Sequence, residues 1–246
     1  MNTTMSSSTY KPYNPPLLIT LHNLSEEEKK IVKSILEEIL EKFERWSNVT
    51  IPRCYSDEQC GYFSSGHLDL RRYIEEWSCR RWPHYKDGIS APDVIADIRR
   101  HGLIYSPHMH VLVTGDMARD FECKRILRGL AFPTVPSSLP GLPKDVVFEV
   151  PGAAVISVGS IKILDGDDWP TAFLIEAAYR FGILYGLPDA DSPNYKGRFY
   201  CSHGDCVMNG KSNKKILENN PNLYCKYDLE RLIYNLKSVH GGHRFY

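Results

Sequence analysis

Three cysteines near the C-terminal end of the chain have the spacing of metal ligands. Cys201 and Cys206 are separated by four residues, and Cys225 follows in the same part of the chain. Seven cysteines are an odd number, and in a reducing compartment such a group favours a bound metal over disulfides. His203, inside the Cys201–Cys206 loop, offers a fourth ligand for a tetrahedral zinc site. The alternative is a set of buried free thiols.

A second candidate site lies in a long apolar segment, residues 171–186. Its side chains are apolar on nearly every face of a helix, which predicts a central, buried helix. Only Glu176 and Arg180 carry charge in this segment. One interpretation is structural: Glu176 pairs with Arg180 one helical turn later, and Gly182 permits a close packing contact.

The same helix partly fits the zinc-peptidase pattern HExxHxxGxxH. In that pattern three histidines hold a catalytic zinc, and the glutamate acts as general base on a bound water. Glu176 and Gly182 occupy their positions in the pattern, whereas the histidine positions hold Ile175, Tyr179 and Tyr185. These three side chains do not form a zinc ligand set. The sequence therefore predicts that the catalytic zinc ligands are lost and that Glu176 is a vestigial general base.

The segment after this helix resembles the archaemetzincins. In their signature the last histidine of the pattern is followed directly by a cysteine, then by a second cysteine, a Cys-x-Met step and a later Cys-x-x-Cys pair. Cys201, Cys206, Met208 and Cys225 reproduce the middle of this signature. The order of strands and turns upstream is also similar, so the resemblance covers residues 105–235.

This resemblance implies an α/β (α+β) fold: a metzincin-like mixed β-sheet with a central buried helix and a Cys-rich C-terminal zinc-binding segment. It also implies a methionine turn at Met208 beneath the helix. The positions of the family's structural zinc ligands hold Cys201, Cys206, Cys225 and Asp228. Asp228 stands where the family has its fourth cysteine, and His203 is the alternative fourth ligand.

The spacing between the helix and the cysteines departs from the family pattern. Residues 186–200 form an insertion before Cys201. A second register, which places Tyr200 at the third histidine position, removes this insertion. It also puts Pro193 inside the helix, and because proline breaks a helix interior we reject this register.

Strands and helices alternate irregularly along the chain, as in a mixed sheet domain. Ser25 and Glu28 form a capping box before an amphipathic helix that we expect to reach Trp46. Further expected helices cover residues 68–77, 92–100 and 168–184, and expected strands cover 17–21, 48–54, 108–114, 146–150 and 153–158. We expect a disordered lead-in at 1–15, an N-terminal α/β part of the same domain at 16–104, and an archaemetzincin-like core with the Met-turn and Cys cluster at 105–246.

Composition excludes several classes of partner. The 246 residues include 30 basic and 30 acidic side chains, so no overall field attracts nucleic acid or an anionic membrane. The polar N-terminus lacks the apolar core of a signal peptide, and no apolar run approaches the length that spans a bilayer. We therefore expect a cytoplasmic protein.

Two functional hypotheses follow from these observations. The first is a pseudoenzyme: a non-catalytic, archaemetzincin-like protein with one structural zinc that serves as a binding or scaffold module. The second is an active metal-dependent peptidase that uses Glu176 as general base and takes ligands such as His108, His110 or His203.

The first hypothesis predicts a partner as well. An extended peptide or protein segment can pair with a sheet edge through backbone hydrogen bonds, which require no metal. We expect this edge near residues 153–158, with Tyr179 and Tyr185 as aromatic surface beside it.

Overall fold

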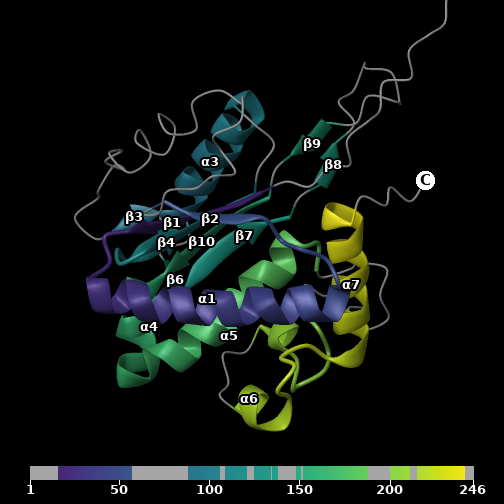
Figure 1. Ribbon diagram of the computed structural model, residues 1–246. Coiled ribbons are helices and arrows are strands. Elements are labelled where there is room, and N and C mark those ends of the chain that lie inside the picture. The colour runs from purple at the N-terminus through teal and green to yellow at the C-terminus, as the bar shows by residue number, and fades with distance from the viewer. Residues whose placement is uncertain are drawn as a thin grey trace, which may run out of the picture.

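A computed structural model describes residues 16–56, 88–105, 109–120, 125–133, 135–137, 148–150, 152–187, 200–210 and 215–241 (Figure 1). The expected lead-in at 1–15 and the expected helix at 68–77 lie outside these residues.

A five-stranded mixed sheet forms the centre of the fold. Its strand order is β2-β1-β4-β10-β7. The strands are β1 (Leu17–His22), β2 (Arg53–Tyr55), β4 (Met109–Thr114), β7 (Gly129–Phe132) and β10 (Ala153–Ser157). β2, β1, β4 and β10 pair in parallel, and β7 pairs antiparallel to β10. β1 lies directly beside β4, so the N-terminal part of the chain and the later part share one sheet.

Both faces of this sheet are covered by helices, and the strand sequences reflect this. In β1, Leu17 and Ile19 belong to one hydrophobic cluster, while Leu18 between them belongs to a second cluster on the other face. Because successive side chains of a strand point to opposite faces, a strand buried on both faces must be apolar throughout. β4 and β10 are also buried along their whole length, and their only polar residues are His110, Thr114 and Ser157.

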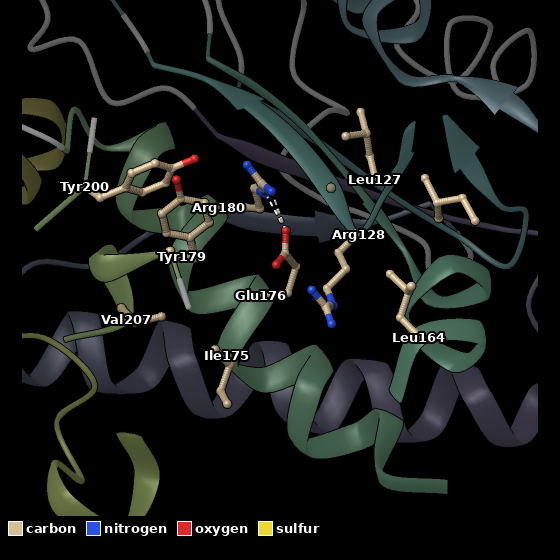
Figure 2. Close-up of a pocket in the computed structure, with 12 residues that line it drawn as sticks. Leu127, Arg128, Leu164, Ile175, Glu176, Tyr179, Arg180, Tyr200 and Val207 are labelled. Carbon is tan, nitrogen blue, oxygen red and sulfur yellow. Dashed lines mark hydrogen bonds and ion pairs between the residues drawn. The ribbon is translucent and has the colours of Figure 1, made fainter. Parts of the chain in front are cut away.

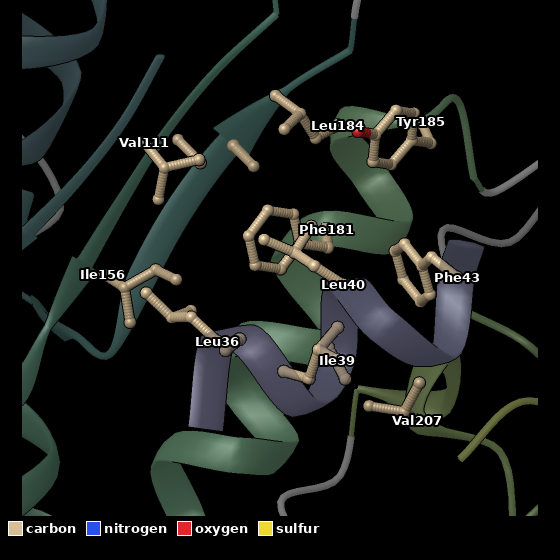
Figure 3. Packing of buried hydrophobic residues seen from close by; sticks show 14 of the residues in the cluster. Leu36, Ile39, Leu40, Phe43, Val111, Ile156, Phe181, Leu184, Tyr185 and Val207 are labelled. Carbon is tan, nitrogen blue, oxygen red and sulfur yellow. The ribbon is translucent and has the colours of Figure 1, made fainter. Parts of the chain in front are cut away.

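Helices α1 (Glu26–Ser47) and α5 (Trp169–Leu184) cover one face, and α3 (Ala91–Tyr105) covers the other (Figure 1). The predicted capping box is confirmed: Ser25 accepts a hydrogen bond from the Glu28 amide, and the Glu28 side chain accepts one from the Ser25 amide. Phe43 of α1 meets Phe181 of α5 edge to face, with ring centroids 6.2 Å apart (Figure 3). This packing fixes α5 as the central buried helix that the sequence predicts.

The remaining elements are shorter or lie outside the main sheet. They are β3 (Ile89–Ser90), β5 (Ala118–Asp120), β6 (Arg125–Leu127), β8 (Val135–Ser137), β9 (Phe148–Val150), α4 (Val158–Asp165), α6 (Lys215–Asn219), α7 (Lys226–His240), and the short 3-10 turns η2 (Gly166–Asp168) and η3 (Val207–Asn209). α7 packs against α1 and carries the C-terminal cysteine region.

The free edge of the sheet differs from the sequence-based expectation. Residues 153–158 are not an edge, because β10 is hydrogen-bonded to β4 on one side and to β7 on the other. Among the described residues, the strand at that end of the sheet is β7, which the sequence analysis did not predict.

None of the helices in the described parts of the chain is both long enough and apolar enough to cross a membrane.

Candidate functional site

The two charged residues of α5 form a buried ion pair. Arg180 Nε and Nη2 lie 2.6 and 2.5 Å from Glu176 Oε1. The Arg180 side chain is 15% exposed and the Glu176 side chain 6%. The guanidinium also lies over the Tyr179 ring, 4.7 Å from its centroid, in a cation–π contact. The pairing expected from the one-turn spacing of Glu176 and Arg180 is confirmed.

This ion pair lies in a pocket of about 210 Å³. Figure 2 shows Tyr179 and Tyr200 on one side of the pair, and Arg128, Leu127 and Leu164 on the other. Arg128 is held by Asp165, with Nε–Oδ2 and Nη2–Oδ1 distances of 3.0 and 3.1 Å. The pocket therefore combines an apolar wall, an aromatic wall and a neutral ion pair between them.

Gly129 allows the edge strand β7 to approach this ion pair. A Cβ at Gly129 would lie 3.0 Å from Arg180 Nε, 3.1 Å from Glu176 Oε1 and 2.7 Å from the Val155 carbonyl oxygen. Any side chain here would push β7 away from both β10 and α5. The ion pair is thus in direct contact with the start of β7, the edge strand among the described residues.

The three positions that replace histidines do not lie together. Ile175 and Tyr179 line the pocket, and burial raises the pKa of the Tyr179 hydroxyl. Tyr185 instead points into the core, where it is 2% exposed and its hydroxyl lies 3.1 Å from His240 Nε2 (Figure 3). The expectation that Tyr185 offers aromatic surface beside the cleft is wrong, because this residue follows the end of α5 and packs against α1.

Tyr200 takes the place in the pocket that Tyr185 was expected to fill. It is 51% exposed and lines the pocket together with Ile175, Glu176 and Tyr179. Tyr200 directly precedes Cys201, which is the position of the last histidine in the archaemetzincin signature. Tyr200 therefore lines the pocket in space, although residues 186–200 separate it from α5 along the chain. Arg128, Leu164 and Gly129 had no such signal in the sequence.

The histidines considered as alternative metal ligands lie elsewhere. His110 Nε2 is 2.8 Å from Thr20 Oγ1, between neighbouring strands of the sheet. His203 Nδ1 is 3.5 Å from Cys201 Sγ. His108 is outside the described residues. Within the described parts of the chain, no group of three or more potential metal ligands includes Glu176.

The cysteine region does form a potential metal site. Cys201, Cys206, Cys225 and Asp228 are all buried, and their ligand atoms lie within 4.8 Å of one another. Cys225 is the N-cap of α7 and Asp228 lies in its first turn, so one helix start positions two of the four groups. The Sγ atoms of Cys201 and Cys225 are 3.7 Å apart, and Asp228 Oδ2 is 3.0 Å from Cys206 Sγ and 3.3 Å from Cys225 Sγ.

These four groups fit a zinc ion. Two thiolates on a tetrahedral zinc lie about 3.8 Å apart, close to the Cys201–Cys225 separation of 3.7 Å. The Cys225 amide also donates a hydrogen bond to Cys206 Sγ at 3.3 Å, which supports a thiolate there. The Cys201 and Cys225 sulfurs, together with burial and Asp228, raise the pKa of the Cys206 thiol. Without a cation these groups therefore compete for protons, and a divalent cation would remove that competition.

Met208 joins the cysteine region to the central helix. A Cβ at Gly182 would lie 2.6 Å from Met208 Sδ and 3.3 Å from Tyr224 Cε1, so Gly182 allows η3 to pack directly against α5. The Tyr224 hydroxyl donates a 2.5 Å hydrogen bond to the Ala178 carbonyl oxygen. The close packing contact expected at Gly182 is confirmed.

Comparisons with known proteins show the fold. No family model matches the chain, and no curated protein matches it. Among solved structures it is similar to a crystal structure of archaemetzincin from Methanopyrus kandleri, with 15% sequence identity and a TM-score of 0.50. The match covers 91% of this chain and 97% of that chain. The chain therefore has an archaemetzincin-like fold, and the likeness extends well beyond the residues 105–235 that the sequence indicated.

Proposed function

We propose that this protein is a non-hydrolytic binding protein on an archaemetzincin-like fold. The observation that carries the proposal is the Glu176–Arg180 ion pair, which lies in the pocket over the central helix. A hydrolytic metal site needs three protein ligands and an open position for water beside a general base. Here an arginine occupies the space next to the carboxylate, and the flanking positions hold Ile175, Tyr179 and Tyr200.

The chemistry of this pair argues against hydrolysis. A carboxylate acts as general base on water when a metal lowers the pKa of that water. In the described parts of the chain, the only group of potential metal ligands is the one formed by the three cysteines and Asp228. Glu176 is instead held by a charge-assisted hydrogen bond to Arg180, so most of the barrier to peptide hydrolysis remains.

A zinc ion, in this proposal, stabilises the fold. Cys201, Cys206, Cys225 and Asp228 would hold it, and all four are buried. A closed site of four protein ligands leaves no position for a substrate, and its binding free energy contributes to folding. Because Cys225 and Asp228 start α7 while Cys201 precedes η3, the site would tie these two segments together.

The partner we propose is an extended polypeptide segment that pairs with β7. An exposed sheet edge offers main-chain donors and acceptors to a second strand, and neighbouring pockets select its side chains. The pocket beside β7 can select the side chains of such a segment. Arg180 Nε and Nη2 both contact Glu176 Oε1, and Oε2 accepts no hydrogen bond from the residues that the structure describes. Oε2 is therefore suited to accept a main-chain N–H of the bound segment.

Selection from a random peptide library, followed by hydrogen exchange, tests this proposal. Binding peptides are expected to slow amide exchange at residues 129–132 and to leave α7 unchanged. Glu176→Gln is expected to weaken their binding, because the amide offers a poorer acceptor. A selected peptide that protects only other segments, or that is cleaved by the protein, would contradict the proposal.

A further inference from the structure

His203 lies beside the metal site without belonging to it. Its Nδ1 atom is 3.5 Å from Cys201 Sγ, which is the spacing of two ligands on one tetrahedral zinc. It is nevertheless absent from the set of four ligand atoms that lie within 4.8 Å of one another. The hydrogen bond from the Cys206 amide to the His203 carbonyl, at 3.2 Å, closes the loop and holds this backbone in place.

His203 also stands where the metal site meets solvent. It lines a surface basin of about 540 Å³ together with Cys225, Tyr227 and other residues. Cys201, Cys206 and Asp228 are at most 2% exposed, whereas Cys225 is 8% exposed and His203 is half-buried. The ring of Tyr227, with its centroid 5.9 Å from that of His203, borders the imidazole on this surface. A cation that approaches from solvent therefore meets His203 and Cys225 before the other three groups.

Among the four zinc ligands, the Asp228 carboxylate is the one that another ligand can replace most easily. Zinc binds thiolates and imidazoles more strongly than a single carboxylate oxygen, so the three sulfurs are the fixed part of the set. Asp228 is buried and contacts Cys206 and Cys225, on the inner side of the site. An imidazole within reach of Cys201 can thus replace the carboxylate without loss of a sulfur ligand.

We propose that His203 is an exchange ligand for a divalent cation. His203 is the first ligand that an arriving cation binds and the last that a leaving cation releases. At rest, the cation is held by Cys201, Cys206, Cys225 and Asp228. The site is then one that equilibrates with zinc in solution, in contrast to a closed four-cysteine site. This inference does not depend on whether the pocket over α5 binds a peptide.

Zinc transfer kinetics test this proposal on the full chain. The zinc-loaded protein is mixed with an excess of a chromophoric chelator, and the reduced, metal-free protein is mixed with Zn²⁺. In His203→Ala we expect both loading and release to slow by about tenfold, the lower end of the roughly 10- to 100-fold effects on metal affinity or activity that groups next to metal ligands have. We expect the zinc content and the melting temperature to stay those of the wild type. Added imidazole should restore the rates.

Asn222→Ala is the matched control, because Asn222 lines the same basin and lacks the thiol, imidazole or carboxylate that zinc prefers. It should exchange zinc at the wild-type rate. The absorption spectrum of the Co²⁺-substituted protein should be the same in His203→Ala and wild type, since His203 is not a ligand at rest. Unchanged exchange rates in His203→Ala would overturn the proposal. Loss of zinc at equilibrium, or a changed Co²⁺ spectrum, would also overturn it by making His203 a permanent ligand.

Discussion

At the scale of residues, Tyr200 rather than Tyr185 lines the pocket over α5. Ile175, Tyr179 and Tyr200 line this pocket around Glu176, whereas Tyr185 packs in the core against Phe43 with ring centroids 6.0 Å apart. Residues 186–200 therefore separate Tyr200 from α5 along the chain but not in space.

This arrangement predicts which substitutions can create a second metal site. Histidines introduced together at Ile175, Tyr179 and Tyr200 should bind a second zinc per chain, because all three side chains face one pocket. The matched triple change at Ile175, Tyr179 and Tyr185 should bind no second zinc. It should also be several kcal/mol less stable, since it removes a large buried aromatic side chain from the core.

Elemental analysis and thermal unfolding distinguish the two triple variants. Equal zinc content in both would show that Tyr200 is not at the third position. If the triple variant at Ile175, Tyr179 and Tyr200 still binds only one zinc per chain, Arg180 alone excludes the second metal.

His240 gives a prediction about pH. Burial lowers the pKa of His240 to about 4, from an ordinary value of 6.5, so the folded protein holds this imidazole neutral. Between those pH values the unfolded chain binds a proton that the folded chain does not, and stability falls as the pH falls. The loss should be nearly complete at pH 4 and amount to roughly 3 kcal/mol.

The comparison for this effect is His240→Gln, which keeps a hydrogen-bonding group near the Tyr185 hydroxyl and cannot titrate. Its melting temperature should fall less than that of the wild type between pH 7 and pH 4. Parallel pH profiles for the two proteins would mean that His240 titrates normally in the fold.

At the scale of elements, the sequence predicted the buried parts of the fold best. β1, α1, β4, β10 and α5 were all expected from their apolar patterns, and a capping box marked the start of α1. These elements could be predicted from local sequence, because a strand covered on both faces or a central helix must be apolar.

Three short strands that sequence reasoning missed depend on distant partners. β5, β6 and β7 are three or four residues long, and a Pro- and Gly-rich stretch follows directly after them. Gly129 shows why this matters: glycine is unfavourable in a strand, yet here it allows β7 to contact both β10 and the ion pair of α5. No local pattern can indicate such a contact.

Gly129→Ala should therefore perturb the site through the edge strand. The new Cβ would lie 2.7 Å from the Val155 carbonyl oxygen, and such overpacking costs about 1–3 kcal/mol. Gly204→Ala is a suitable control, because a Cβ there meets no atom within 4 Å. Chemical denaturation should show a loss of stability for Gly129→Ala only. Equal stability of the two variants would place β7 farther from β10 and α5 than described here.

At the scale of the whole molecule, two parts of the chain meet on α5: the edge strand β7 above its charged residues, and the cysteine region behind Gly182. The fold-level likeness to archaemetzincin covers nearly the whole chain, but at 15% identity it carries no activity with it. What this molecule does depends on the residues in its pocket and its cysteine cluster.

Zinc removal should affect the whole fold. Cys206→Ser should lose zinc and lower the melting temperature, because Cys206 is fully buried and a structural site contributes its binding free energy to folding. A chelator should destabilise the wild type and leave Cys206→Ser unchanged. Full zinc content in Cys206→Ser would show that the metal binds elsewhere.

Peptide hydrolysis by the zinc-replete wild type, compared with Glu176→Gln, tests the central claim most directly. A mixture of unstructured peptides is incubated with each protein and followed by mass spectrometry, with and without a chelator. We predict that no peptide is cleaved above background by either protein, because Glu176 is paired with Arg180 and no described metal ligands surround it. Cleavage by the wild type that the chelator stops and Glu176→Gln abolishes would contradict the account.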